Sequence, residues 1–154
     1  MLKFLRSVLG YGLHPEYRKL ADRIGPVIHT QLSRVMGQSG ETLGHPEEMA
    51  FTYGYLSTFT CRMFRDVGCN DSLSQEEFIQ YVCNGVIPGR LWDIFQRGKA
   101  LSELSKDGER EEFKKTYEAY GKGKDAGVHD AQVFCDGGHA DNLARFLLGQ
   151  PLEA

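Results

Sequence analysis

The sequence has no apolar run long enough to cross a membrane, since a membrane helix needs about 18 or more apolar residues. The alternation of apolar and polar residues that is typical of strands is almost absent. Residues 128–135 are the only doubtful strand candidate. A doubly wound sheet needs strands that alternate with helices, so this architecture is excluded and we expect an all-α protein.

Cysteine is scarce, and its spacing contains no C-x-x-C pair among the four residues present. Cys61 and Cys83 fall on apolar helical patterns, where a reduced cysteine acts as a small hydrophobic residue. No cleavage site of the secretory type follows the first apolar residues. We therefore expect free thiols in a reducing compartment, and we predict a cytoplasmic protein.

Neither sign of charge is in large excess. Lys and Arg number 18 against 21 Asp and Glu, which gives a formal net charge of −3. This balance argues against a basic stripe, so we expect no nucleic-acid partner. The segment GKGKDAG, residues 121–127, lacks the G-x-x-x-x-G-K-[ST] spacing of a phosphate-binding loop. We interpret it as a flexible loop.

What the sequence does have is a series of apolar residues at helical spacing. A chain of 154 residues fits one domain, and it can bury about two thirds of its unfolded surface. We expect a single all-α domain over residues 1–154, a bundle or orthogonal array of about six or seven helices. The predicted helices cover residues 1–9, 15–36, 46–67, 74–87, 91–105, 107–120 and 142–148.

We make a specific prediction for each of three places in this pattern. Pro26 removes a backbone hydrogen bond within residues 15–36, so we expect a kink or a clean break there. Residues 1–9 are amphipathic; they either pack on the body of the protein or anchor it to a membrane or partner surface. The polar elbow at residues 66–77 favours two helices that cross rather than a long antiparallel hairpin.

The elbow, DVGCNDSLSQEE, resembles an EF-hand calcium loop. Calcium prefers six to eight oxygen ligands, and a glutamate closes such a loop. The positions that match loop positions one, five, nine and twelve are Asp66, Asn70, Ser74 and Glu77.

The elbow also departs from this resemblance at two positions. Gly68 stands at position three, where an oxygen ligand is expected, and Asp71 stands at position six, where the loop needs glycine. The other interpretation is a capped corner, because Ser74 and Glu77 form an S-x-x-E capping box at the start of the next helix.

The densest group of polar residues lies near the C-terminal end of the sequence. Cysteine, histidine and carboxylate side chains can together bind zinc. Aspartates at these positions are also good helix caps and turn formers, which gives a structural alternative. The candidate metal ligands are His129, Cys135, Asp136, His139 and Asp141.

Trp92 is the only tryptophan, and it follows a Pro-Gly corner together with Phe95. A large aromatic residue in this position is usually a core anchor. An exposed Trp92 would instead indicate a partner site, so we keep Trp92 and Phe95 as candidate partner-binding residues.

No nucleophile motif or paired carboxylates stand out, and fold alone assigns no chemistry. Our first hypothesis is a non-enzymatic interaction module: an adaptor, inhibitor or regulator of another protein, with homo-oligomers as a further option and no cofactor expected. The alternative is a metal-dependent enzyme or sensor that uses the cluster from His129 to Asp141. The last is a small-ligand or haem-binding bundle, with His14, His29 and His45 as candidate ligands.

Overall fold

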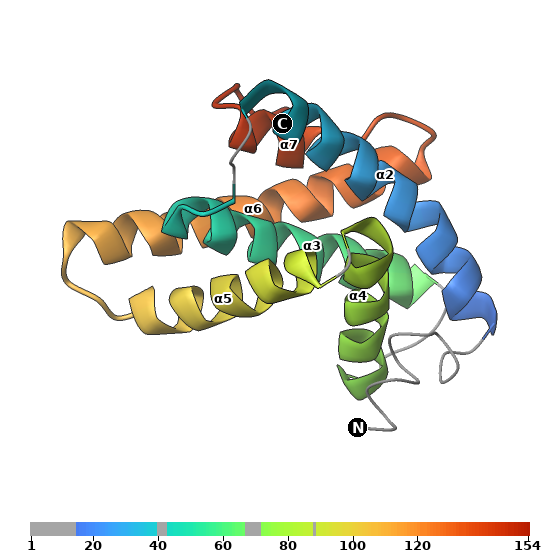
Figure 1. The fold of residues 1–154 in the computed structure, drawn as a ribbon, viewed down its shortest axis with the longest axis horizontal. Helices are drawn as coiled ribbons and strands as arrows, with labels where there is room; N and C mark the ends of the chain where they lie inside the picture. Colours follow the sequence, from blue (N-terminus) through green and yellow to red (C-terminus); the bar gives the residue numbers. More distant parts are fainter. Residues whose placement is uncertain (1–14, 40–42, 67–71, 88) are drawn as a thin grey trace.

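The computed structural model describes residues 15–39, 43–66, 72–87 and 89–154 (Figure 1). Within these residues the chain forms six helices and no strand, which confirms the prediction of an all-α single domain. The prediction of a possible strand at residues 128–135 is wrong, since those residues are helical. The predicted helix at residues 1–9 lies outside the described residues. The helices are α2 (Pro15–Ser39), α3 (Pro46–Asp66), α4 (Ser72–Val86), α5 (Arg90–Ser105), α6 (Glu111–Cys135) and α7 (Asn142–Leu147).

Helix α3 is the centre of the fold and touches every other described helix. It begins at Pro46, as predicted, because a first-turn proline needs no hydrogen bond from its nitrogen. Phe51, Tyr55 and Phe59 on α3 are fully buried. In Figure 1, α5 and α6 run beside α3, while α4 runs across it. The prediction of crossing helices at the elbow is therefore confirmed.

The long contact between α3 and α6 depends on glycine. The predicted loop at residues 121–127 is wrong, because these residues lie inside α6. A Cβ atom at Gly127 would lie 2.6 Å from the carbonyl oxygen of Tyr55, and one at Gly123 would overlap that of Phe51. Glycines four residues apart share one helix face, so they let the two backbones approach closely. Packing has here outweighed the low helix propensity of glycine.

Helix α2 continues through Pro26, so the predicted clean break does not occur. Ile24 and Ile28, on either side of Pro26, are both fully buried and keep the apolar stripe in phase. Pro26 itself faces solvent, where water can reach the carbonyl that its missing N–H leaves unbound. Thr30 donates a 2.8 Å hydrogen bond from its hydroxyl to the carbonyl of Pro26.

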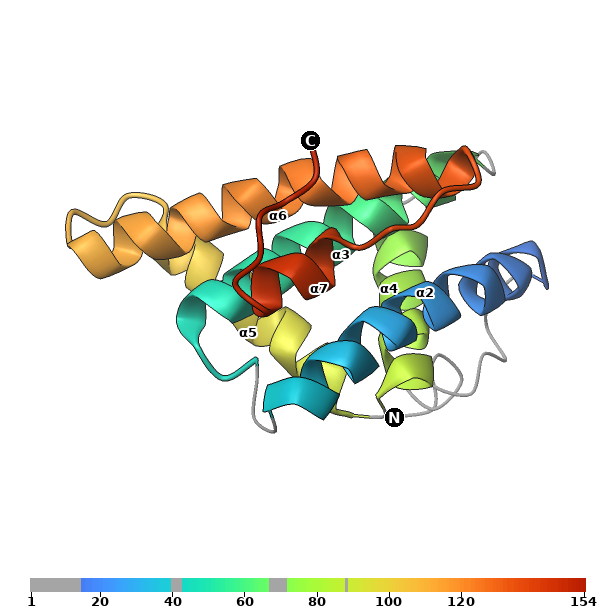
Figure 2. The ribbon, with the colours of Figure 1, turned by 90° about the horizontal axis from the view of Figure 1, so that it is seen from above.

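Aromatic contacts fix the helices that cross α3. Phe64 packs on Tyr17 of α2 and on Phe78 of α4, with ring centroids 4.7 and 5.1 Å apart. Phe146 of α7 stacks on Phe51 of α3 at 3.8 Å. Figure 2 shows α7 lying between α2 and α6, over α3. None of the described helices is long and apolar enough to cross a membrane.

Candidate functional site

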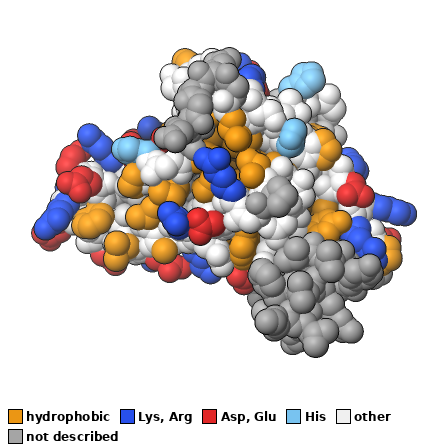
Figure 3. Space-filling model, in the orientation of Figure 1, with side chains coloured by type: hydrophobic (Ala, Val, Ile, Leu, Met, Phe, Trp, Pro, Cys, Tyr) orange, Lys and Arg blue, Asp and Glu red, His pale blue; other side chains and the backbone are white. Residues whose placement is uncertain are grey.

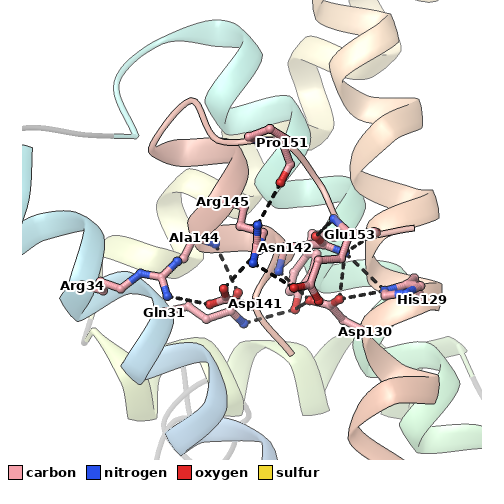
Figure 4. A network of polar contacts seen from close by, with 11 residues as sticks. Gln31, Arg34, His129, Asp130, Asp141, Asn142, Ala144, Arg145, Pro151 and Glu153 are labelled. Atoms are coloured by element: carbon pink, nitrogen blue, oxygen red, sulfur yellow. Dashed lines mark hydrogen bonds and ion pairs between the residues drawn. The ribbon is translucent and has the colours of Figure 1, made fainter. Parts of the chain in front are cut away.

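A buried polar network joins four helices near the C-terminal end of α6 (Figure 4). The hydroxyl of Tyr55 on α3 donates a 2.7 Å hydrogen bond to Oδ2 of Asp130 on α6. Nε2 of Gln31 on α2 donates to the Tyr55 hydroxyl at 3.1 Å, and Oε1 of Gln31 accepts from the backbone N–H of Ala144 on α7 at 3.1 Å. The Tyr55, Gln31 and Asp130 residues are all buried. Burial, followed by the nearby Asp130, raises the pKa of Tyr55 well above its ordinary value.

Asp130 also holds the start of α7. Its Oδ2 accepts a 2.9 Å hydrogen bond from the backbone N–H of Asn142, and its Oδ1 accepts one of 2.9 Å from the Asn142 side chain. Asp130 therefore satisfies a first-turn N–H of α7, a role that a local N-cap usually fills. The N-cap residue itself, Asp141, makes no side-chain bond to the described first turn. It pairs with Arg34 at 2.8 Å and with Arg145 at 3.2 Å.

His129 lies at the edge of this network. Its Nδ1 is 3.2 Å from Oδ1 of Asp130 and 3.3 Å from Nδ2 of Asn142, and its side chain is 29% exposed. A carboxylate beside an imidazole can fix the ring orientation and tautomer in an enzyme. In this protein both carboxylate oxygens of Asp130 already accept hydrogen bonds: Oδ2 from Tyr55 and the backbone of Asn142, and Oδ1 from the Asn142 side chain. The network therefore ties four helices together, each hydrogen bond contributing about 0.5–1.5 kcal/mol net.

The five predicted metal ligands do not converge on one point. Sγ of Cys135 lies 3.6 Å from Sδ of Met63, and Asp136 accepts hydrogen bonds from Gln132. Among the residues that the structure describes, no three His, Cys, Asp or Glu side chains are placed to hold a metal ion. The geometry gives no support to a metal centre built from His129, Cys135, Asp136, His139 and Asp141.

Most of the resemblance to a calcium loop lies outside the described part of the chain. Residues 67–71, including Asn70, are not described, nor are the side chains of Asp66 and Ser74. Helix α4 begins at Ser72, two residues before the predicted start, and Glu77 on it is exposed. The calcium-loop interpretation remains a prediction.

The candidate haem ligands are dispersed. His14 lies outside the described residues. His29 on α2 is exposed, with Nδ1 3.4 Å from the hydroxyl of Ser33. His45 precedes α3, with Nδ1 3.6 Å from a carboxylate oxygen of Glu47. These two histidines line different pockets.

A groove lies between α2 and residues 134–141. Its volume is about 640 Å³. Pro26 and Val27 of α2 form one wall, and Phe134 forms part of the other. Arg34 and Asp141, which are paired with each other, line the same groove. The guanidinium of Arg23 lies 5.7 Å above the ring of Phe134, as in a cation–π contact.

A row of five aromatic rings crosses α5, α3 and α6. Trp92 stacks on Phe95 at 5.2 Å between centroids, and Phe95 meets Tyr53 edge-on at 5.0 Å. Tyr53 stacks on Tyr120 at 5.5 Å, and Tyr120 lies 5.8 Å from Tyr117. Phe95 is buried and Trp92 half-buried, so these two candidate partner-binding residues anchor the row in the core.

The other end of this row reaches the surface. Tyr117 near the start of α6 is 37% exposed, and Leu104 near the end of α5 is 68% exposed. Leu101 and Phe113 on the same two helices are half-buried. Figure 3 shows hydrophobic side chains over the part of the surface where α5 and α6 lie, with charges of both signs around them. We call Leu101, Leu104, Phe113, Tyr117 and Tyr120 the hairpin face.

Neither the polar network nor the hairpin face was predicted from the sequence. Gln31 sits between Ile28 and Leu32 in a buried stripe, and a polar residue in such a stripe is the signal that could have indicated the network. Leu104 and Tyr117 continue apolar helical patterns, and periodicity alone gives no sign of which member of a pattern remains uncovered.

No protein-family model, curated protein or solved structure matches this chain. Its function must therefore be argued from the geometry of its own side chains.

Proposed function

We propose that this chain is a non-enzymatic protein–protein interaction module, acting as an adaptor, inhibitor or regulator of another protein. Its binding surface is the hairpin face. The observation that carries the proposal is the aromatic row that runs from buried Phe95 to exposed Tyr117, with Leu104 exposed on the other helix of the hairpin. Aromatic residues are enriched at protein interfaces, where rigid rings bury large areas at low entropic cost.

Anchoring in the core supports this use of the surface. Tyr120 stacks on Tyr53, which in turn meets Phe95 edge-on, and Tyr117 packs on Tyr120. A side chain that is already ordered loses less conformational freedom when a partner covers it. The hairpin face is therefore prepared for binding before a partner arrives.

The charges around the hairpin face favour a protein partner. On α6, Glu118 and Lys122 form an ion pair of 3.2 Å, and Lys114 and Lys115 are exposed nearby in the sequence. On α5, Glu103 is exposed. A rim with both signs of charge suits the mixed polar rim of a protein–protein interface better than a polyanion.

The test places a photo-crosslinking residue, p-benzoylphenylalanine, at position 117 or at position 128 in source cells. Val128 is the matched control, because it is also exposed, at 43%, and lies on the same helix. We expect a protein adduct of defined mass at position 117 only. The purified partner should then bind the Leu104→Ser/Tyr117→Ser chain at least about tenfold more weakly than wild type. The Val128→Ser chain should bind as wild type does.

Two results would overturn the proposal. The first is equal crosslinking at positions 117 and 128. The second is a partner whose affinity does not change in the Leu104→Ser/Tyr117→Ser chain while that chain keeps its melting temperature. An adduct between two copies of this chain would assign the hairpin face to self-association instead.

A second candidate function, small-ligand binding, is favoured by the groove beside α2. Its volume of about 640 Å³ falls within the range of about 300–1,000 Å³ for ligand pockets. Its apolar walls, which include Pro26, Val27 and Phe134, suit an aromatic compound. The probe 1-anilinonaphthalene-8-sulfonate should then bind the wild-type chain and lose binding in the Val27→Glu chain. Unchanged binding would exclude this groove as the site.

A further inference from the structure

The segment that follows α7 is held against that helix by specific side-chain contacts. The chain leaves α7 through a turn at Gly149, which has a φ of 69°. Residues 150–154 then run back beside α7 without helical structure (Figures 2 and 4). Two side chains of α7, Asn142 and Arg145, hold this returning segment.

Asn142 binds the backbone of the segment through its whole carboxamide group. Its Oδ1 accepts a 2.7 Å hydrogen bond from the backbone N–H of Glu153, and its Nδ2 donates one of 3.1 Å to the carbonyl of Glu153. A carboxamide that pairs with both the N–H and the C=O of one residue recognises the peptide backbone itself. This contact is therefore available to any chain with the same backbone course.

Arg145 and the part of the hydrophobic core beneath Leu152 contact side chains of the segment, so they can select which residues are bound. Nη2 of Arg145 pairs with Oε1 of Glu153 at 2.8 Å, and Nη1 donates to the carbonyl of Pro151 at 3.2 Å. Leu152, between them, packs against the hydrophobic core. The three consecutive residues thus present a carbonyl, an apolar side chain and a carboxylate to one binding surface.

The two side chains that hold the segment also have partners outside it. Asn142 is 1% exposed, and its backbone N–H and its Nδ2 both bind the buried carboxylate of Asp130. Nε of Arg145 lies 3.2 Å from Oδ2 of Asp141. Asn142 keeps its hydrogen bonds to Asp130 and Arg145 keeps its ion pair with Asp141 when the segment leaves, so we expect both side chains to hold their positions.

The bound segment itself is held at the surface. Pro151 is exposed, and the Glu153 side chain that pairs with Arg145 is 48% exposed. An ion pair with an exposed partner contributes little to stability, because solvent screens it. A binding surface that holds a segment of its own chain through backbone and side-chain contacts is the arrangement expected of a peptide-binding site that is occupied in cis.

We propose that Asn142, Arg145 and the surface beneath Leu152 form a clamp for a Pro-Leu-Glu segment of a partner protein. Residues 151–153 occupy this clamp in the free chain. The clamp is separate from the hairpin face and does not depend on the function proposed above. A tethered segment acts at a high effective concentration, so a free peptide competes poorly until the tether is released.

The test uses the full chain with Leu152→Asp/Glu153→Lys to release its own segment. The probe is a fluorescein-labelled, C-terminally amidated peptide with the sequence LGQPLEA, followed by fluorescence polarisation. The released chain should bind this peptide at least about tenfold more tightly than wild type, because its clamp is open. If the double variant has a much lower melting temperature, the Glu153→Lys chain replaces it.

A charge exchange separates specific binding from general effects on folding. A chain released by Leu152→Asp/Glu153→Gln, whose own segment has no charge to pair with position 145, should bind LGQPLEA; with Arg145→Glu added, it should lose affinity for LGQPLEA and gain affinity for LGQPLKA. Failure of the folded, released chain to bind LGQPLEA would overturn the proposal, as would equal binding of both peptides. A wild-type dimer that disappears in the released chain would assign the clamp to exchange between two copies and exclude a separate partner.

Discussion

The Tyr55 hydroxyl and the Asp130 carboxylate are 2.7 Å apart, although the two residues are separated by 75 positions in the sequence. This hydrogen bond connects the central helix α3 to α6, and through Asp130 it reaches the start of α7. The clamp residue Asn142 depends on the same carboxylate. A single buried contact thus links the core of the protein to a surface that we propose binds a partner.

Replacing Tyr55 with Phe should lower the free energy of unfolding by about 1–3 kcal/mol, because buried Asp130 and Gln31 lose a hydrogen-bond partner. Urea unfolding followed by circular dichroism measures this change. The control is Tyr117→Phe, whose exposed hydroxyl should matter by less than about 0.5 kcal/mol. Equal effects of the two substitutions would contradict a stabilising network.

Two glycine substitutions in α6 should change the free energy of unfolding in opposite directions. At Gly127 an added Cβ meets the backbone of α3, so Gly127→Ala should destabilise the protein by about 1–3 kcal/mol. At Gly121 no heavy atom of the described structure lies within 4 Å of such a Cβ. Gly121→Ala should therefore stabilise the protein by up to about 1 kcal/mol through helix propensity. Thermal and urea unfolding of both variants provide the comparison, and a shared sign would argue against close packing of α3 on α6.

The cysteines should differ strongly in reactivity. Cys83 is fully buried, and burial raises the pKa of its thiol, while Cys135 is exposed. Iodoacetamide near pH 8 should modify Cys135 in the folded protein and leave Cys83 unmodified, because the thiolate is the reactive form. Peptide mapping by mass spectrometry gives the extent of modification at each site. In concentrated urea the two should react alike, and early modification of Cys83 would mean that the core around α4 opens readily.

Stability should fall at high pH, partly through Tyr55. Its pKa in the folded protein lies above the unfolded value of about 10, so the folded state holds this proton more tightly. The contribution of the Tyr55 proton to the free energy of unfolding is fully present below about pH 10 and is lost as the pH rises through the folded-state pKa of Tyr55. The stability advantage of wild type over Tyr55→Phe should therefore shrink above about pH 10. Urea midpoints of both chains across this range measure the difference, and other titrating groups affect both alike. A constant difference would mean that Tyr55 does not retain its proton.

Local patterns were enough to predict the helical class and most helix positions. The starts of α3 at Pro46 and α5 after Gly89 follow from proline and glycine signals that act within one turn. The buried stripe that includes Ile24 and Ile28 follows from spacing alone. Such signals depend only on residues that are close together in the sequence, so they can be predicted without the tertiary structure.

The polar sites depend on pairs of residues that are distant in the sequence. Nothing close to Asp130 in the sequence indicates that Tyr55 and Asn142 bind it while Cys135 contacts Met63. The glycines of α6 predicted a loop by their propensity, and only the facing backbone of α3 makes them helical. Periodicity alone fixes which residues share a helix face, while packing between helices decides which polar groups meet in the core and which apolar groups stay exposed.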